Sequence, residues 1–476
     1  MIFNSFQFLW LFPLIFGGYY AISYLLKKKE QGKESNVLLL LISYALYMQY
    51  VPWCAFVLLW VTLVTYFMAL CITVSNKSKK LICWLGTISG IAPLIIFKYY
   101  NFVIDNANGM LGHGNLPGLN WAIPIGISFF SFQAIGYLVD VYRQRIPAER
   151  NFLDYALFVS FFPQIMSGPI SRASDLLPQI KGKRTFDETQ AVQGLKWLLW
   201  GMFLKTVMAD RLGLYVDSVY DNFQYQSGFS CLVASFMYTM QIYGDFAGYS
   251  LMAIGVGKLM GFDLVNNFNR PYFAASITEF WKRWHISLTR WLTTYIYIEL
   301  GGNRCSKLRQ YWNIMVTFLV SGVWHGANWT FILWGLMHGL LQCAEKILGI
   351  DPKGKYANLP LYRKLKPVRI LVTFLLVNIA WILFRLPSLD VMKIVFGKIL
   401  TWEGSGLFLP SNSTLGFMLI SLTIVISKEI CEEYFPGIRL FCNRSATVRW
   451  FSYLMVIALI MLCGVFDSSQ FIYVKF

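Results

Sequence analysis

Long apolar runs separated by short polar loops constrain this sequence more than any other feature. The N-terminal part contains such runs at 5–26, 36–52, 54–75, 81–104 and 119–142. Each is close to the roughly 20 residues that an α-helix needs to cross a bilayer. The composition agrees, because only 14% of the residues are charged, whereas soluble proteins contain about 25%. The sequence therefore predicts an all-α polytopic integral membrane protein.

The loops between these runs alternate in charge. Residues 27–34, 75–80 and 143–150 are basic, whereas 50–53 is uncharged and 105–118 contains no lysine or arginine. Basic loops are retained on the cytoplasmic side of a membrane. The alternation therefore predicts that the N-terminus lies outside, and the later loops predict the same for the C-terminus.

The rest of the chain predicts further spans and two irregular pieces. The spans fall near 191–216, 229–257, 311–326, 328–348, 369–386, 414–431 and 450–466. Residues 152–166 are apolar but too short to cross, and they run into a stretch at 162–172 where proline and glycine stop a regular helix. This piece is predicted to be re-entrant. Residues 276–300 carry tryptophans on one face and basic residues on the other, which is typical of a surface helix. We expect about 11 transmembrane helices plus two re-entrant elements around a central funnel or tunnel, with 387–413 unassigned.

His325 lies where two of these apolar runs meet, in the sequence Gly-Val-Trp-His-Gly-Ala-Asn-Trp. An imidazole at membrane depth keeps its place only with polar partners or a water-filled cavity. Histidine also changes protonation near neutral pH, which suits proton transfer. The sequence predicts either a catalytic histidine or a histidine that packs helices together.

Other polar residues inside apolar or amphipathic segments are also candidates. His285 lies at the seam between the two faces of 276–300, and Asp245 lies within the span 229–257. For each, a structural role is the alternative: an interfacial anchor for the first, a helix–helix hydrogen bond for the second. His338, Gln342 and Glu345 form a polar seam on one helix, where His338 is predicted to pack or to support another residue.

Several classes of site are not indicated. The nine cysteines show no C-x-x-C spacing, so neither a disulfide framework nor a zinc site is predicted, and we expect no metal. The net charge of +17 is distributed in loops between apolar runs, which argues against nucleic-acid binding. An acidic D-x-D motif of the kind that glycosyltransferases use is absent from the sequence.

Five pieces of the chain together resemble membrane-bound O-acyltransferases (MBOAT). They are FFPQIMSGPISR (161–172), YGDFAGYSLMAIG (243–255), FWKRWHISLTRWL (280–292), LGGNR (300–304) and SGVWHGANWTFILWGLMHG (321–339). The resemblance is to the bacterial branch with alginate and peptidoglycan O-acetyltransferases and the teichoic acid D-alanyl transferase. It implies one membrane domain over 1–476, with N-terminal helices in 1–150, a catalytic core in 151–350 and C-terminal helices in 351–476.

The resemblance also implies roles for single residues. His325 would be the catalytic histidine and His285 a second motif histidine, on a funnel that joins the two membrane faces. Candidates for substrate binding or acyl transfer are Trp324, Arg283, Asn303, Asn328 and Asp245. Tyr473 in the ending FIYVKF resembles a motif whose tyrosine has been proposed to carry the acyl group, and an interfacial anchor is its alternative.

Some positions depart from the family pattern and leave the substrate and partner open. Members often read S-D-M where this chain has Ser-Leu-Met at 250–252. They often carry Arg-Asp and Ile-Pro where this chain has Thr-Thr at 293–294 and Ile-Glu at 298–299.

The expected activity is transfer of an acyl group, acetyl in the first instance, from a cytoplasmic thioester to a hydroxyl of a cell-envelope or exported polysaccharide. Acetyl-CoA or the phosphopantetheine of an acyl carrier would be the donor, and no bound cofactor is expected. A periplasmic or extracellular transferase is the expected partner, and the bacterial cytoplasmic membrane the expected location. The alternatives are a D-alanyl transferase and, in another class, a proton-coupled transporter or flippase.

Overall fold

The structure is a computed structural model that describes residues 3, 5–25, 33–49, 51–75, 77–112, 116–435, 437, 441–466 and 472. Within these residues every regular element is a helix, which confirms the predicted all-α class. The chain forms two compact units. The first comprises Met1–Leu198 and Ala253–Val265, and the second Leu199–Met252 and Asn266–Phe476.

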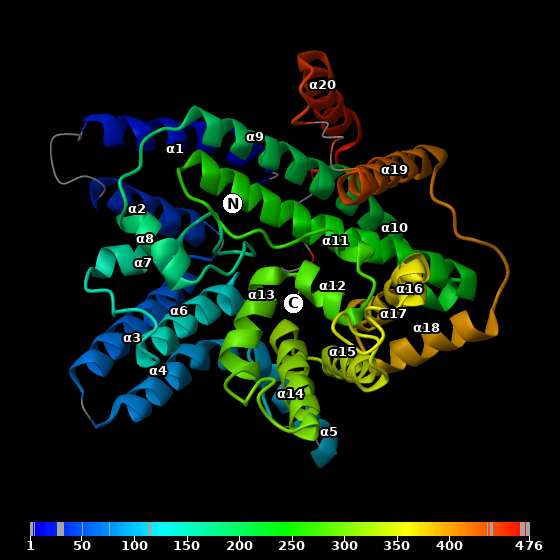
Figure 1. The fold of residues 1–476 in the computed structure, drawn as a ribbon, viewed down its shortest axis with the longest axis horizontal. Helices are drawn as coiled ribbons and strands as arrows, with labels where there is room; N and C mark the ends of the chain where they lie inside the picture. Colours follow the sequence, from blue (N-terminus) through cyan, green and yellow to red (C-terminus); the bar gives the residue numbers. More distant parts are fainter. Residues whose placement is uncertain are drawn as a thin grey trace. The chain divides into compact units, whose positions relative to one another are not determined.

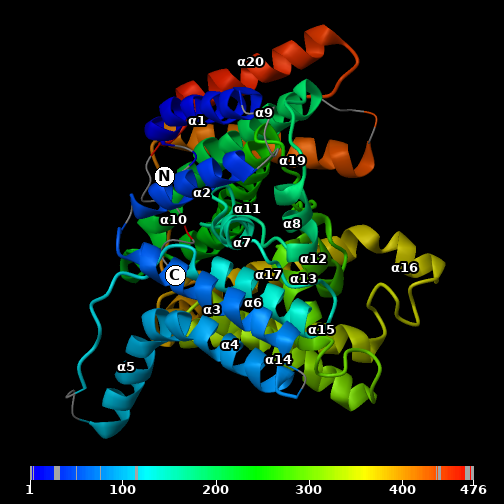
Figure 2. The same cartoon turned by 90° about the vertical axis from the view of Figure 1, so that its left-hand side faces the viewer.

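The first unit is built on N-terminal helices. They are α1 (Phe6–Leu25), α2 (Lys33–Met48), α3 (Cys54–Val74), α4 (Lys79–Leu94), η1 (Ile95–Tyr99), α5 (Tyr100–Leu111), α6 (Ile127–Tyr142), α7 (Phe152–Ser160), α8 (Ala173–Lys181) and most of α9 (Glu188–Met202). Helices α3, α4 and α6 pack against one another and lie side by side in Figure 2. A hydrogen bond of 2.7 Å between the Thr65 and Tyr155 hydroxyls joins α3 to α7. Such bonds satisfy polar groups in a segment where water is scarce.

The piece predicted to be re-entrant consists of a short helix and an irregular turn. Helix α7 ends at Ser160, and residues 161–172 are not helical, although all of them except Arg172 are buried. Side chains bridge this turn, since Gln164 Nε2 donates to Gln133 Oε1 (3.0 Å) and Ser171 Oγ donates to Gln164 Oε1 (2.8 Å). Irregular backbone at membrane depth needs this kind of internal support.

The second unit holds the remaining helices. They are η2 (Phe203–Ala209), α10 (Asp210–Tyr220), η3 (Phe223–Tyr225), most of α11 (Gly228–Leu259), η4 (Pro271–Phe273), α12 (Ile277–Arg283), α13 (Ile286–Leu292), η5 (Thr293–Tyr297), α14 (Lys307–His325), α15 (Trp329–Leu348), α16 (Pro360–Lys364), α17 (Lys366–Arg385), α18 (Leu389–Thr401), α19 (Asn412–Tyr434) and α20 (Ala446–Cys463). Figure 1 shows α14 and α15 next to each other, and they form the most extensive helix pair of the unit. Helix α18 lies in the region that the sequence left unassigned.

The amphipathic segment 276–300 is not one continuous helix as its periodicity suggested. It divides into α12, α13 and the π-helical turn η5. The break falls at His285, whose backbone has φ 42° and ψ 54°, in the left-handed region. A residue in that conformation cannot continue a right-handed helix. Three tryptophans of the predicted stripe are nevertheless buried: Trp281, Trp284 and Trp291.

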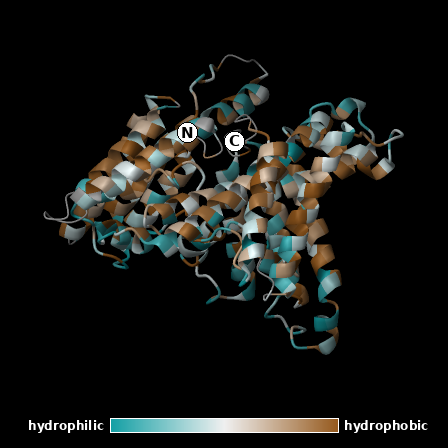
Figure 3. Cartoon of the chain, turned by 90° about the horizontal axis from the view of Figure 1, so that it is seen from above, coloured by the Kyte–Doolittle hydropathy of each residue, from teal (hydrophilic) through white to brown (hydrophobic). Residues whose placement is uncertain are grey.

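Five helices of the described chain are long and apolar enough to cross a membrane. They are Cys54–Val74, Lys79–Leu111, Lys366–Arg385, Asn412–Tyr434 and Ala446–Cys463. The second of these is longer than the predicted span 81–104, because α4 continues through η1 into α5. Figure 3 shows hydrophobic residues along most helices and hydrophilic residues concentrated in loops and at helix ends. This pattern is that of a multi-pass membrane protein.

Candidate functional site

His325 is the last residue of α14, and the turn that follows leads directly into α15. The two helices approach closely through small residues, since a Cβ on Gly322 would meet the Phe331 carbonyl oxygen and a Cβ on Gly335 the Phe318 carbonyl oxygen. Glycine at these two positions therefore sets the helix spacing. The close packing of α14 against α15 therefore fixes the position of His325 at the end of α14.

The His325 ring is packed among aromatic side chains. It is 5% exposed, and its centroid lies 4.8 Å from Trp324, 5.0 Å from Trp334 and 5.2 Å from Phe384. The contacts with these three rings are edge-to-face. Rings held this way restrict the orientation of the imidazole. The site around His325 is thus buried and aromatic.

His285 lies in the same unit and also contacts Trp324. The ring of Trp324 is 6.1 Å from that of His285 and 4.8 Å from that of His325. His285 is fully buried, and Phe246 of α11 packs edge-on against it at 4.5 Å. Its Nδ1 lies 3.2 Å from the Oδ1 of Asn267. The structure therefore gives the two motif histidines a shared aromatic neighbour, Trp324.

The polar seam of α15 faces α12. Trp281 Nε1 donates to His338 Nδ1 at 3.3 Å, and Gln342 Nε2 donates to Thr278 Oγ1 at 3.4 Å. Glu345 accepts from the Thr278 backbone N–H (3.0 Å) and hydroxyl (2.9 Å) at the start of α12. A carboxylate at a helix N-terminus satisfies amide groups that the helix leaves unpaired. These bonds hold α12 in register against α15.

A pocket of about 330 Å³ lies between these elements of the second unit. That volume is within the range of small-molecule sites, roughly 300–1,000 Å³. Its walls include Trp281 and Phe318. His325 does not line it, but Ser321, one helical turn earlier on α14, does. The pocket therefore ends close to the histidine.

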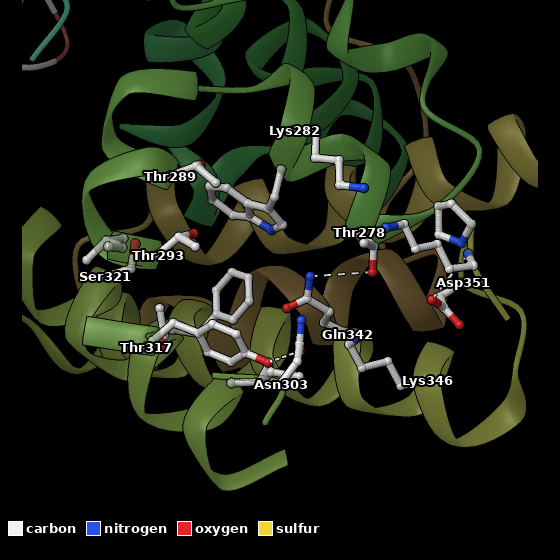
Figure 4. A pocket seen from close by; sticks show the side chains of 17 residues that line it. Thr278, Lys282, Thr289, Thr293, Asn303, Thr317, Ser321, Gln342, Lys346 and Asp351 are labelled. Atoms are coloured by element: carbon white, nitrogen blue, oxygen red, sulfur yellow. Dashed lines mark hydrogen bonds between the residues drawn. The ribbon is translucent and has the colours of Figure 1, made fainter. Parts of the chain in front are cut away.

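The two ends of the pocket differ in chemistry, as Figure 4 shows. One end carries hydroxyl groups: Thr289, Thr293, Thr317 and Ser321. The other end carries charged groups, Lys282, Lys346 and Asp351. In the described chain neither lysine has an ion-pair partner. An anionic group would be favoured at this charged end.

The other predicted residues are placed as follows. Asn303 lines the pocket and accepts a 2.6 Å hydrogen bond from the Tyr297 hydroxyl. Asn328 caps α15 by accepting from Thr330 N (3.1 Å) and donates to the Pro387 carbonyl (2.5 Å).

Arg283 does not line the pocket. Its guanidinium pairs with Glu279 (2.7 Å) and Glu433 (3.1 Å). The neighbouring Lys282 occupies the pocket wall. Tyr473 lies outside the described residues.

Asp245 lies in a buried ion-pair cluster with two residues that sequence reasoning missed. Lys205 Nζ is 2.5 Å from Asp245 Oδ1 and 2.6 Å from Asp210 Oδ1. The three side chains are each 1% exposed. The backbone N–H of Ile472 donates to the second carboxylate oxygen of Asp245 at 3.0 Å. None of the three lines the pocket, so this cluster is a separate feature of the unit.

The sequence matches one protein-family model over most of its length. Residues 2–349 match the membrane-bound O-acyltransferase family. The chain belongs to the MBOAT family. This MBOAT chain is 38% identical to the probable alginate O-acetylase AlgI of Pseudomonas aeruginosa, over 93% of this chain and 83% of that protein.

Two further relatives extend the comparison. The chain is 36% identical to the peptidoglycan O-acetyltransferase of Helicobacter pylori, over 84% of this chain and 80% of that protein. It is 27% identical to the teichoic acid D-alanyltransferase of Streptococcus thermophilus, over 65% of this chain and 77% of that protein. The family and these names support an O-acyltransferase activity for this MBOAT chain. They confirm the resemblance that the motifs indicated.

Proposed function

We propose that the protein transfers an acetyl group from a cytoplasmic thioester across the membrane, for O-acetylation of a cell-envelope or exported polysaccharide. One observation carries this proposal: the pocket has lysines at one end and ends beside Ser321, one turn from His325. Relatives at 36–38% identity are named for O-acetylation of alginate and peptidoglycan, which supports acetyl as the acyl group. D-alanyl is the second candidate, because of the similarity to teichoic acid D-alanyltransferase.

The donor would enter the pocket from its charged end. Lys353 and Asp351 at that end belong to the basic loop 351–369, which the charge pattern assigns to the cytoplasm. The lysines would attract the phosphates of acetyl-CoA or of an acyl carrier's phosphopantetheine. The pantetheine arm would then run past Trp281 and Phe318, so that the thioester lies near Ser321. No cofactor would stay bound between turnovers.

His325 would act as the general base. In its neutral form it accepts the proton of the acceptor hydroxyl while the hydroxyl oxygen bonds to the thioester carbonyl carbon. The carbon–sulfur bond then breaks, and the thiolate that leaves takes up the proton. His285 or Asn328 would orient the reactants or stabilise the developing oxyanion. The aromatic surroundings exclude water, so that the acyl group is not lost to hydrolysis.

The membrane arrangement is part of the proposal. We propose about 11 spans and two re-entrant elements around a funnel, in a bacterial cytoplasmic membrane with both termini outside. A separate periplasmic or extracellular transferase would receive the acetyl group. Reporter fusions within 27–34 and 105–118 are expected to lie on opposite faces, because only the first loop is basic.

The direct test is an acetyl-transfer assay with the purified full-length protein in lipid. Radiolabelled acetyl-CoA is expected to label a polysaccharide or a partner transferase in the absence of an ion gradient. Labelled D-alanyl carrier protein, tested in parallel, distinguishes the second acyl candidate. Transport that depends on an ion gradient, without transfer of label, would overturn the proposal in favour of a proton-coupled transporter.

The lysines at the charged end give a second prediction. Changing both Lys282 and Lys346 to alanine should raise the donor KM about fivefold and reduce its dependence on salt, because each charge contributes on the order of 0.5 kcal/mol. The turnover at saturating donor should change little. Lys393→Ala is the matched control, since that lysine is exposed and pairs only with Asp390 on α18 among the described residues. An unchanged KM in the double variant would exclude this end as the donor entrance.

A further inference from the structure

Asn267 is a polar side chain next to His285 that makes several hydrogen bonds. It lies in the irregular segment after α11 and is completely buried. Its Oδ1 accepts from the backbone N–H of Ser287 (3.1 Å) and from the Ser287 hydroxyl (2.9 Å). Its Nδ2 donates to the Ser250 hydroxyl (3.2 Å). The amide therefore joins Ser250 of α11 to the start of α13 and the turn at His285.

These bonds determine which way the Asn267 amide faces. The backbone N–H of Ser287 can only donate, so the atom that it meets must be the carbonyl oxygen. A flipped amide would place two donors against each other at 3.1 Å. The same Oδ1 lies 3.2 Å from His285 Nδ1. Because a carbonyl oxygen can only accept, Nδ1 must carry the proton.

The backbone at His285 holds the ring in this place. The residue has φ 42° and ψ 54°, and its neighbour Ile286 donates its N–H to the Asn267 carbonyl at 2.9 Å. Phe246 closes one side of the ring at 4.5 Å. Main-chain and side-chain groups of Asn267 thus both fix the turn from which the imidazole projects.

We propose that Asn267 is a positioning residue that keeps neutral His285 in the tautomer with the proton on Nδ1. The lone pair then lies on Nε2, so His285 can accept a hydrogen bond from a neighbouring hydroxyl of the acceptor and thereby orient the hydroxyl whose proton His325 takes. This inference rests on the proposed acyl transfer and deepens it. It selects between the two roles left open above: a neutral His285 of this tautomer cannot donate from Nε2 to an oxyanion.

The tautomer can be measured without any activity. The chain has four histidines, so ¹⁵N-histidine labelling of the full-length protein in lipid gives few signals. His285→Gln assigns the signal of His285. In the wild type, Nδ1 is expected to be protonated and Nε2 unprotonated at neutral pH. A neutral His285 with its proton on Nε2 would overturn the proposal.

Variants of Asn267 test directly whether this residue sets the tautomer of His285. Asn267→Leu removes the acceptor and is expected to move the proton to Nε2 or give a mixture, with turnover lowered about a hundredfold and an unchanged donor KM. Asn267→Asp keeps an oxygen acceptor and should keep Nδ1 protonated. An unchanged His285 spectrum in Asn267→Leu would exclude Asn267 from this role.

A matched control separates positioning from loss of stability. Asn378 on α17 is also a buried amide, and it bonds to Thr239 (2.7 Å) and Ser235 (3.0 Å). Asn378→Leu should reduce stability but leave the His285 spectrum unchanged, and a shifted spectrum there would contradict the proposal. If acetyl transfer itself is not found while the tautomer is as expected, the proposed function fails and the assignment of Asn267 stands.

Discussion

His325→Ala is expected to give a folded, membrane-inserted protein that transfers the acyl group about 10²–10⁴-fold more slowly, because that is the contribution of general-base catalysis. The side chain projects at the end of α14, one turn beyond the pocket residue Ser321. Acetate on the surface polysaccharide, measured by mass spectrometry, reports the effect in cells.

The loss of packing must be separated from the loss of chemistry. The ring is 5% exposed and touches three aromatic side chains, so its removal leaves a cavity that costs on the order of 2–4 kcal/mol. His325→Gln fills more of that space and should be equally inactive while more stable. His113→Ala, in a loop predicted to be outside, is the matched histidine control and should retain activity. Wild-type acetylation in the alanine variant would exclude His325 as the base.

The membrane class and the motif histidines could be predicted from the sequence because their signals are local. Apolar runs, loop charge and the Gly-Val-Trp-His-Gly-Ala-Asn-Trp junction lie within a few residues of one another. Helix α14 ends at His325, and the next position requires glycine, because at Gly326 an added Cβ would meet the ring of Phe331. The catalytic roles of the two motif histidines stay predictions, which the variants described above test.

Other features depend on contacts between distant segments, which hydropathy cannot reveal. Periodicity suggested one helix over 276–300, but it carries no information on the left-handed backbone of His285. Asn267 was missed because a polar residue in a short loop looks like ordinary turn chemistry. Its partners Ser250 and Ser287 lie 17 and 20 residues away in the chain. The polar seam of α15 could be predicted from the spacing of its residues, but the sequence did not indicate that this seam contacts α12.

The buried cluster of Lys205 shows the same limit and gives the second large effect. From the sequence Asp245 was a lone carboxylate, because its partner lies 40 residues earlier. Lys205→Met should lower the free energy of unfolding by about 3–5 kcal/mol, since it leaves two aspartates buried without their cation. Thermal unfolding in detergent and the amount of folded protein in membranes measure the loss.

If the ion pairs stabilise this cluster, variants of its three residues should differ in stability in an order that loss of packing alone would not produce. Asp245→Asn leaves Lys205 paired with Asp210 at 2.6 Å, so it should destabilise less than Lys205→Met. Replacing all three with apolar residues of similar volume should recover most of the loss, because no unpaired charge remains. Lys393→Met is the surface control: Lys393 is 72% exposed and its partner Asp390 87%, and such pairs contribute about 0–1 kcal/mol. If Lys205→Met were no less stable than this control, the ion pairs would not hold this part of the unit together, and the ammonium would have to serve another purpose.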